Sequence, residues 1–106
     1  MSNAVLRFGR VEGMLEWVAA DDGRQLRLTV FLETSAEYRV VRKEIVQPIL
    51  LEGNSIDLYW LADQYTQETI GVDLAAEGWE VIGAGDPPTL EPGEIPRSAT
   101  YAVRLL

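Results

Sequence analysis

The alternation of apolar and polar residues over positions 25–33 constrains the fold more than any other feature of the sequence. One face of this segment, in an extended chain, carries Leu26, Leu28, Val30 and Leu32. Phe31 is the one apolar residue on the opposite face. A period of two is the period of a β-strand that buries one face. The segment therefore predicts a strand packed on a hydrophobic core.

Turn signals before this strand predict a three-stranded meander over residues 4–33. Glu12-Gly13 and Asp22-Gly23 each stand between apolar runs, and a tight hairpin turn needs residues that accept positive φ. With Asp22-Gly23 as the loop, Met14 faces Phe31 on the outer side of the hairpin. The expected strands are 4–11, 14–20 and 25–33.

The middle of the chain predicts two further strand regions. Residues 38–46 predict a strand with a bulge at Val40-Val41, because two consecutive apolar residues break the alternation there. Gly53-Asn54 is a hairpin signal, and it predicts strands over 49–51 and 55–62.

One short helix is expected within residues 63–77, most clearly over 73–77. Ile70 and Leu74 stand at helical spacing, Thr66 is a candidate cap, and Gly78 fits a helix end in the left-handed conformation. Two more strands are expected, over 79–82 and 98–106, separated by a long loop rich in Pro and Gly over 85–97.

The length of 106 residues fits a single domain. Residues 1–3 are set aside as a disordered or expression-derived tail. The expected fold is mainly β, an antiparallel sandwich or partly open barrel of about seven strands with one short helix before the Gly78-Trp79 strand. The alternative is an α+β fold, an antiparallel sheet with a helix on one face. The aromatic residues expected in the core are Phe8, Trp17, Trp60 and Trp79.

The chain has no cysteine and no histidine. Disulfides, thiol catalysis and zinc–cysteine sites are therefore excluded, and the commonest general base and metal ligand are absent. No phosphate-binding loop occurs, so we expect no catalysis, no metal site and no cofactor. The remaining enzymatic alternative uses a pair of carboxylates as acid and base, drawn from Asp57, Asp63, Glu68, Asp73 and Glu80.

The net charge of −8 is unevenly distributed along the chain. Residues 1–50 hold seven basic and seven acidic residues, whereas residues 51–106 hold two basic and ten acidic residues. This charge favours a partner protein with a basic surface and opposes binding to nucleic acid or to anionic membranes. We see no secretory signal and no apolar run of membrane-spanning length, so we expect a cytoplasmic protein.

The sequence thus favours a non-catalytic protein-binding or assembly module that acts through an apolar sheet face and an acidic C-terminal half. The expected partner is a protein with a basic surface or another copy of the chain. The alternative is a small-molecule-binding β-barrel in which tryptophans line a cavity. The candidate contact residues are Met14, Val18 and Phe31 on the outer face of the meander, Tyr59 and Leu61 on the second hairpin, and the acids Asp57, Glu91 and Glu94.

Overall fold

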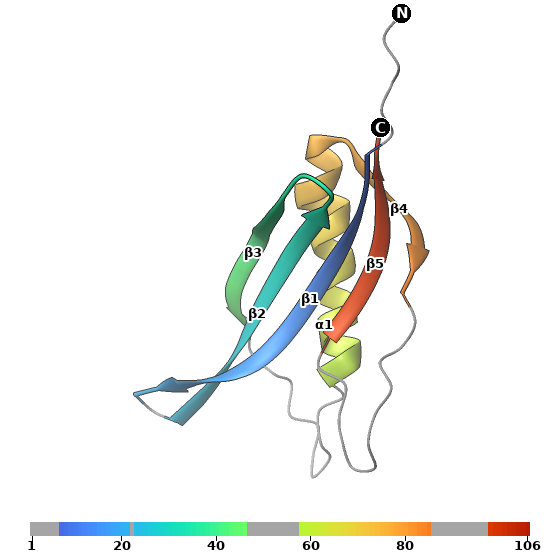
Figure 1. The fold of residues 1–106 in the computed structure, drawn as a ribbon. Helices are drawn as coiled ribbons and strands as arrows, with labels where there is room; N and C mark the ends of the chain where they lie inside the picture. The colour runs from blue at the N-terminus through green and yellow to red at the C-terminus, as the bar shows by residue number, and fades with distance from the viewer. Residues whose placement is uncertain (1–6, 22, 47–57, 86–97) are drawn as a thin grey trace, which may run out of the picture.

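The computed structural model describes residues 7–21, 23–46, 58–85 and 98–106. Five strands form one antiparallel sheet in the order β3-β2-β1-β5-β4. Helix α1 covers one face of this sheet and leaves the other face open (Figure 1). The strands are β1 (Arg7–Ala20), β2 (Gly23–Thr34), β3 (Tyr38–Val46), β4 (Trp79–Ala84) and β5 (Ser98–Leu105).

The mainly β, antiparallel prediction is confirmed, but the sandwich or barrel of seven strands is not. An open sheet with a helix on one face is the α+β alternative. A single helical layer buries one side of each strand here, and among the described residues no second sheet covers the core.

The expected turn at Glu12-Gly13 is wrong, because residues 7–20 form one uninterrupted strand. Gly13 lies directly beneath α1. A Cβ atom at Gly13 would come within 1.8 Å of the Thr66 Oγ1 atom. The glycine therefore allows the helix to approach the sheet closely, and it does not make a turn.

The β1–β2 hairpin has a register that differs by two residues from the predicted one. Leu15 pairs with Leu28, and Met14 lies opposite Thr29 and not opposite Phe31. The last pair is Ala20 with Gly23, so the turn begins one residue earlier than expected. A shift of two residues keeps every side chain on its predicted face, and for that reason the predicted buried face of β2 is correct.

Strand β3 has the predicted bounds and the predicted bulge. Phe31 pairs with Val40 and Val30 pairs with Arg42, which leaves Val41 without a partner in the ladder. The bulge puts Val41 against the core while Val40 stays exposed on the other face.

Residues 58–62 are helical, so the predicted strand over 55–62 is wrong. Helix α1 spans Leu58–Thr69. Leu58, Ala62 and Thr66 are buried at intervals of four residues, which is helical spacing. Trp60, which the strand pattern placed in the core, is 64% exposed. The Gly53-Asn54 turn and the strand over 49–51 lie outside the described residues.

The helix continues as a π-helical turn, η1 (Ile70–Leu74), and a 3₁₀ turn, η2 (Ala75–Glu77). It ends at Gly78, whose φ of 92° confirms the predicted left-handed helix end. Thr66 is not a cap, because it lies inside α1 and its hydroxyl donates to the Ala62 carbonyl oxygen at 2.6 Å. The predicted strands at 79–82 and 98–106 are confirmed as β4 and β5.

The core lies between α1 and the sheet, and of the four aromatic residues expected there only Trp79 is buried. Phe8 and Trp17 belong to one strand, nine positions apart, so they point to opposite faces. Phe8 is on the open face. Trp17 is on the helix side near the hairpin tip, which extends beyond α1 (Figure 1).

Candidate functional site

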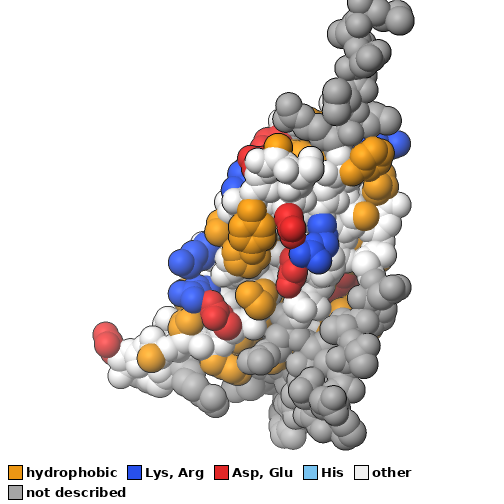
Figure 2. Space-filling view, in the orientation of Figure 1, with side chains coloured by type: hydrophobic (Ala, Val, Ile, Leu, Met, Phe, Trp, Pro, Cys, Tyr) orange, Lys and Arg blue, Asp and Glu red, His pale blue; other side chains and the backbone are white. Residues whose placement is uncertain are grey.

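One face of the sheet is left uncovered by α1 (Figure 1), and we call it the open face. Figure 2 shows apolar and charged side chains mixed across it. In β1 and β2 this face consists of the residues that alternate with the buried ones. Its apolar residues include Phe8, Met14, Val18, Ala20, Phe31, Tyr38, Val40, Ile45 and Ala102.

Three of these residues form an aromatic patch on β2 and β3. The rings of Phe31 and Tyr38 are stacked, with centroids 5.2 Å apart and an interplanar angle of 19°. Val40 pairs directly with Phe31 across the ladder. Tyr38 is 64% exposed and Val40 is 49% exposed. Exposed apolar side chains that adjoin one another on a sheet are typical of contact surfaces.

Ion pairs separate the apolar residues of the open face. Arg10 Nη2 lies 2.7 Å from Glu33 Oε2 and 3.7 Å from Glu12 Oε2. Arg27 pairs with Glu16, and Arg104 pairs with Glu80 across the β5–β4 ladder. With Lys43, the described strands place four basic and four acidic residues on this face. Its formal net charge is therefore zero, in a chain whose net charge is −8.

The structure brings three predicted contact residues together on the open face and separates the others. Met14 is 38% exposed, and Val18 and Phe31 are half-buried. Tyr59 and Leu61 belong to α1 and pack against the core. Their predicted position on the surface of a second hairpin is therefore wrong. The remaining candidates, Asp57, Glu91 and Glu94, lie outside the described residues.

Sequence reasoning missed three exposed apolar residues of the open face. Tyr38, Val40 and Ile45 come from β3, whose phase the sequence leaves ambiguous. The signal was present, because a bulge at Val40-Val41 returns Tyr38 and Val40 to the face of Phe31. Their alignment with Phe31 could be read only once the β2–β3 register was fixed.

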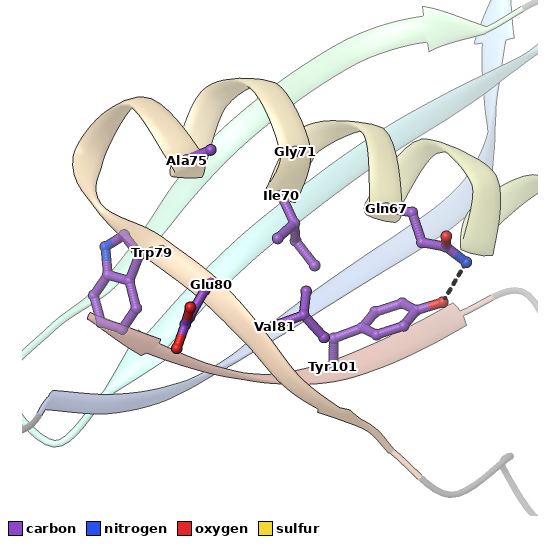
Figure 3. Close-up of a pocket in the computed structure, with 8 residues that line it drawn as sticks. All are labelled: Gln67, Ile70, Gly71, Ala75, Trp79, Glu80, Val81 and Tyr101. Atoms are coloured by element: carbon purple, nitrogen blue, oxygen red, sulfur yellow. Dashed lines mark hydrogen bonds between the residues drawn. The ribbon is translucent and has the colours of Figure 1, made fainter. Parts of the chain in front are cut away.

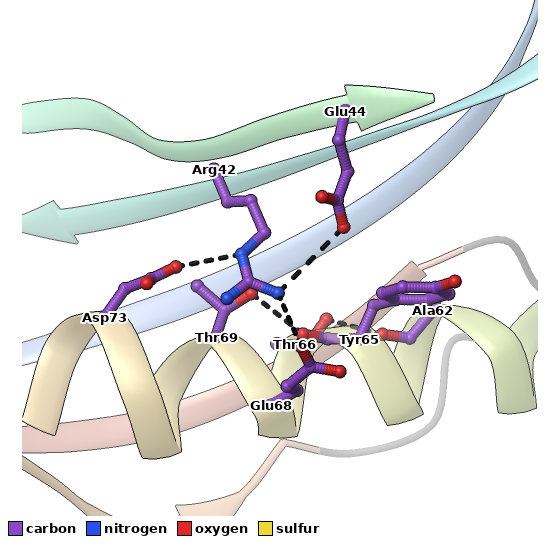
Figure 4. Close-up of polar contacts among 8 residues, drawn as sticks. All are labelled: Arg42, Glu44, Ala62, Tyr65, Thr66, Glu68, Thr69 and Asp73. Atoms are coloured by element: carbon purple, nitrogen blue, oxygen red, sulfur yellow. Dashed lines mark hydrogen bonds and ion pairs between the residues drawn. The ribbon is translucent and has the colours of Figure 1, made fainter. Parts of the chain in front are cut away.

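The opposite side of the sheet holds a polar cluster centred on Arg42, shown in Figure 4. Arg42 Nε donates to Asp73 Oδ2 at 2.8 Å, and Arg42 Nη1 donates to Glu68 Oε1 at 3.1 Å. The side chain is 16% exposed. The hydrogen bond to Asp73 raises the pKa of Arg42 above its usual value, and burial opposes this rise. Arg42 therefore stays charged and joins β3 to the π-helical turn.

Arg39 makes a similar contact from β3 to Glu77. These pairs join basic residues of the first half of the chain to acidic residues of the second half within one molecule. Charges that looked available for an intermolecular contact are thus engaged internally.

Helix α1 and the turns η1 and η2 together form one helical segment over residues 58–77. A cavity of about 440 Å³ lies between this helical segment and strands β4 and β5. Ile70 points from the helical segment toward Val81 and Tyr101 (Figure 3). Trp79 stands at one end of the cavity, and Gln67 stands at the other, where its Nε2 atom donates to the Tyr101 hydroxyl at 2.9 Å. Trp17 and Trp60, which the barrel alternative placed around a cavity, do not line this one.

The acids proposed for carboxylate catalysis are all engaged where the structure describes them. Glu68 and Asp73 share Arg42, Asp63 accepts from Gln67, and Glu80 accepts from Arg104. Within the described ranges, no group of three or more acids is placed to hold a metal ion. The same ranges contain no helix with the length and apolar character needed to cross a membrane.

Comparison of the chain with known protein families, with curated proteins and with solved structures finds no match.

Proposed function

We propose that the protein is a non-catalytic assembly module, and that its open face binds the open face of a second copy. The supporting observation is the combination of exposed apolar side chains with zero net charge on this face, in a chain whose net charge is −8. The aromatic patch of Phe31, Tyr38 and Val40 supplies the apolar contact.

Electrostatics favours a second copy over a basic partner at this surface. Two chains of like charge repel each other least where their contacting surfaces are neutral. A basic partner would instead be attracted to an acidic surface, and among the described residues acids predominate on the helix side. The described helical segment contains Asp63, Glu68, Asp73 and Glu77 and no basic residue.

A two-fold contact also suits the mixed pattern of the open face. In such a contact each surface patch meets the same surface of the partner, so a face with equal numbers of acids and bases complements itself. The paired charges then serve as a polar rim around the aromatic patch, as in many protein interfaces.

The test is the molar mass of the 11.8 kDa chain by light scattering, compared with two matched variants. Val40→Glu puts a charge into the aromatic patch, so we expect it to raise the dimer Kd by about tenfold or more, equivalent to about 1.4 kcal/mol. Val72→Glu is the control, because Val72 is 60% exposed in η1, away from the open face. It should leave the mass unchanged.

Salt and charge reversal separate the proposal from its alternatives. Added salt screens the repulsion between two acidic chains, so it should favour the dimer. Dissociation by salt would indicate a contact dominated by opposite charges. Val40→Lys should also weaken self-association, whereas a basic partner would be weakened by the lysine and not by the glutamate. A wild-type chain that stays monomeric at submillimolar concentration would refute the proposal.

A further inference from the structure

The cavity between the helical segment and β4 has no role in the proposed assembly, because it lies on the side of the sheet away from the open face. Its volume of about 440 Å³ is within the range of small-molecule sites. Its walls are mainly apolar, with Ile70, Val81 and the ring of Tyr101 facing one another (Figure 3).

Gly71 is a glycine among the residues that line this cavity. It lines the cavity from η1. A Cβ atom at this position would meet nothing within 4 Å, and the φ of Gly71 is not positive. Neither packing nor backbone conformation therefore requires a glycine here, although glycine is less favourable than alanine in a helix. The lack of a side chain keeps the cavity open.

The polar groups at the edges of the cavity restrict what it can bind. Among the described residues the Tyr101 hydroxyl has one hydrogen bond, which it accepts from Gln67, so its own O–H can donate to an acceptor. Glu80 also borders the cavity, but its carboxylate is paired with Arg104. Asp63 is held at the Gln67 end by a hydrogen bond of 2.9 Å. The Asp63 carboxylate and the net charge of −8 on the chain disfavour an anion.

We propose that this cavity binds an uncharged aromatic small molecule that carries a hydrogen-bond acceptor. The rings of the ligand pack between Ile70 and Val81, beside Trp79. Its acceptor receives the hydrogen bond of the Tyr101 hydroxyl. Gly71 leaves the space that the ligand occupies.

The test measures binding of prodan, a neutral fluorescent naphthyl ketone, by the shift of its emission. Gly71→Leu fills the cavity from the helix and should weaken binding by at least about tenfold. Gly83→Leu is the matched control, because a Cβ atom there also meets nothing within 4 Å and Gly83 does not line the cavity. It should change the affinity by less than about twofold.

Two further measurements examine the hydrogen bond and the charge. Tyr101→Phe keeps the ring and removes the donor, so it should weaken prodan binding by about three- to tenfold. Anilinonaphthalene sulfonate, an anionic probe, should bind at least about tenfold more weakly than prodan. Val81→Phe fills the cavity from the sheet, and it replaces Gly71→Leu if thermal denaturation shows that the leucine variant does not fold.

Equal binding to the Gly71→Leu and Gly83→Leu variants would overturn the proposal, as would equal binding of the two probes. Prodan binding should persist in Val40→Glu, which alters only the open face. Failure of the assembly proposal and failure of this one are therefore distinguishable.

Discussion

The two faces of the sheet use the same strands in opposite ways. Val30 is fully buried beneath the helical layer, whereas its neighbour Phe31 is half-buried on the open face. The covered face is continuous and apolar. On the open face, ion pairs separate the apolar side chains. A sheet with one helical layer therefore buries the side chains of one face and leaves those of the other face exposed to solvent.

The pairing of the charged residues also differs between the two faces. Open-face acids are matched by bases on neighbouring strands. On the helix side, acids of the helical segment form ion pairs with basic residues of another element, because the helical segment contains no basic residue. Arg39 and Arg42 supply these bases from β3.

The largest expected difference between the faces comes from adjacent residues of β1. Gly13→Ala should lower the free energy of unfolding by about 2–3 kcal/mol, because the new Cβ atom collides with Thr66 beneath the helix. Met14→Ala, on the open face, should cost less than about 1 kcal/mol. Urea denaturation followed by circular dichroism measures both.

A double variant verifies the cause of the Gly13 effect. Thr66→Ala removes the Oγ1 atom that stands 1.8 Å from the added Cβ. In the Gly13→Ala background it should therefore restore part of the lost stability, with a coupling of about 1 kcal/mol or more. Additive losses would show that the helix does not approach β1 at this point.

A smaller difference is expected between the two arginine clusters. Arg42→Met should lower the free energy of unfolding by about 1–2 kcal/mol, because it leaves Asp73 and Glu68 without their partly buried partner. Arg10→Met should have a much smaller effect, since its side chain is 54% exposed and exposed ion pairs contribute little. Equal effects in thermal denaturation would contradict the division between faces.

The smallest expected effect distinguishes a glycine of the helical layer from a glycine of the sheet. Gly71→Ala should raise the free energy of unfolding by about 0.5–1 kcal/mol, because the added methyl has space and alanine is the better helix former. The same substitution at Gly13 destabilises. A loss of stability at Gly71 in urea denaturation would mean that the cavity is already filled there.

Several features of the fold were predictable from local patterns. The alternation of residues 25–33 assigned Phe31 to the outer side. The Val40-Val41 doublet predicted the bulge of β3. The helix end at Gly78 followed from its sequence position after a helical segment. These signals are local because backbone conformation and side-chain period depend on a few neighbouring residues.

The sequence by itself determined which side chains of the strands share a face, and it determined the net negative charge of the chain. Only the tertiary structure decided what covers each face. Gly13 allows a turn or a close helix contact equally well, and Leu58 and Ala62 fit a strand or a helix. A long-range contact, between Gly13 and Thr66, separates these possibilities, because the packing energy of a helix on a sheet exceeds the small local preference of either residue.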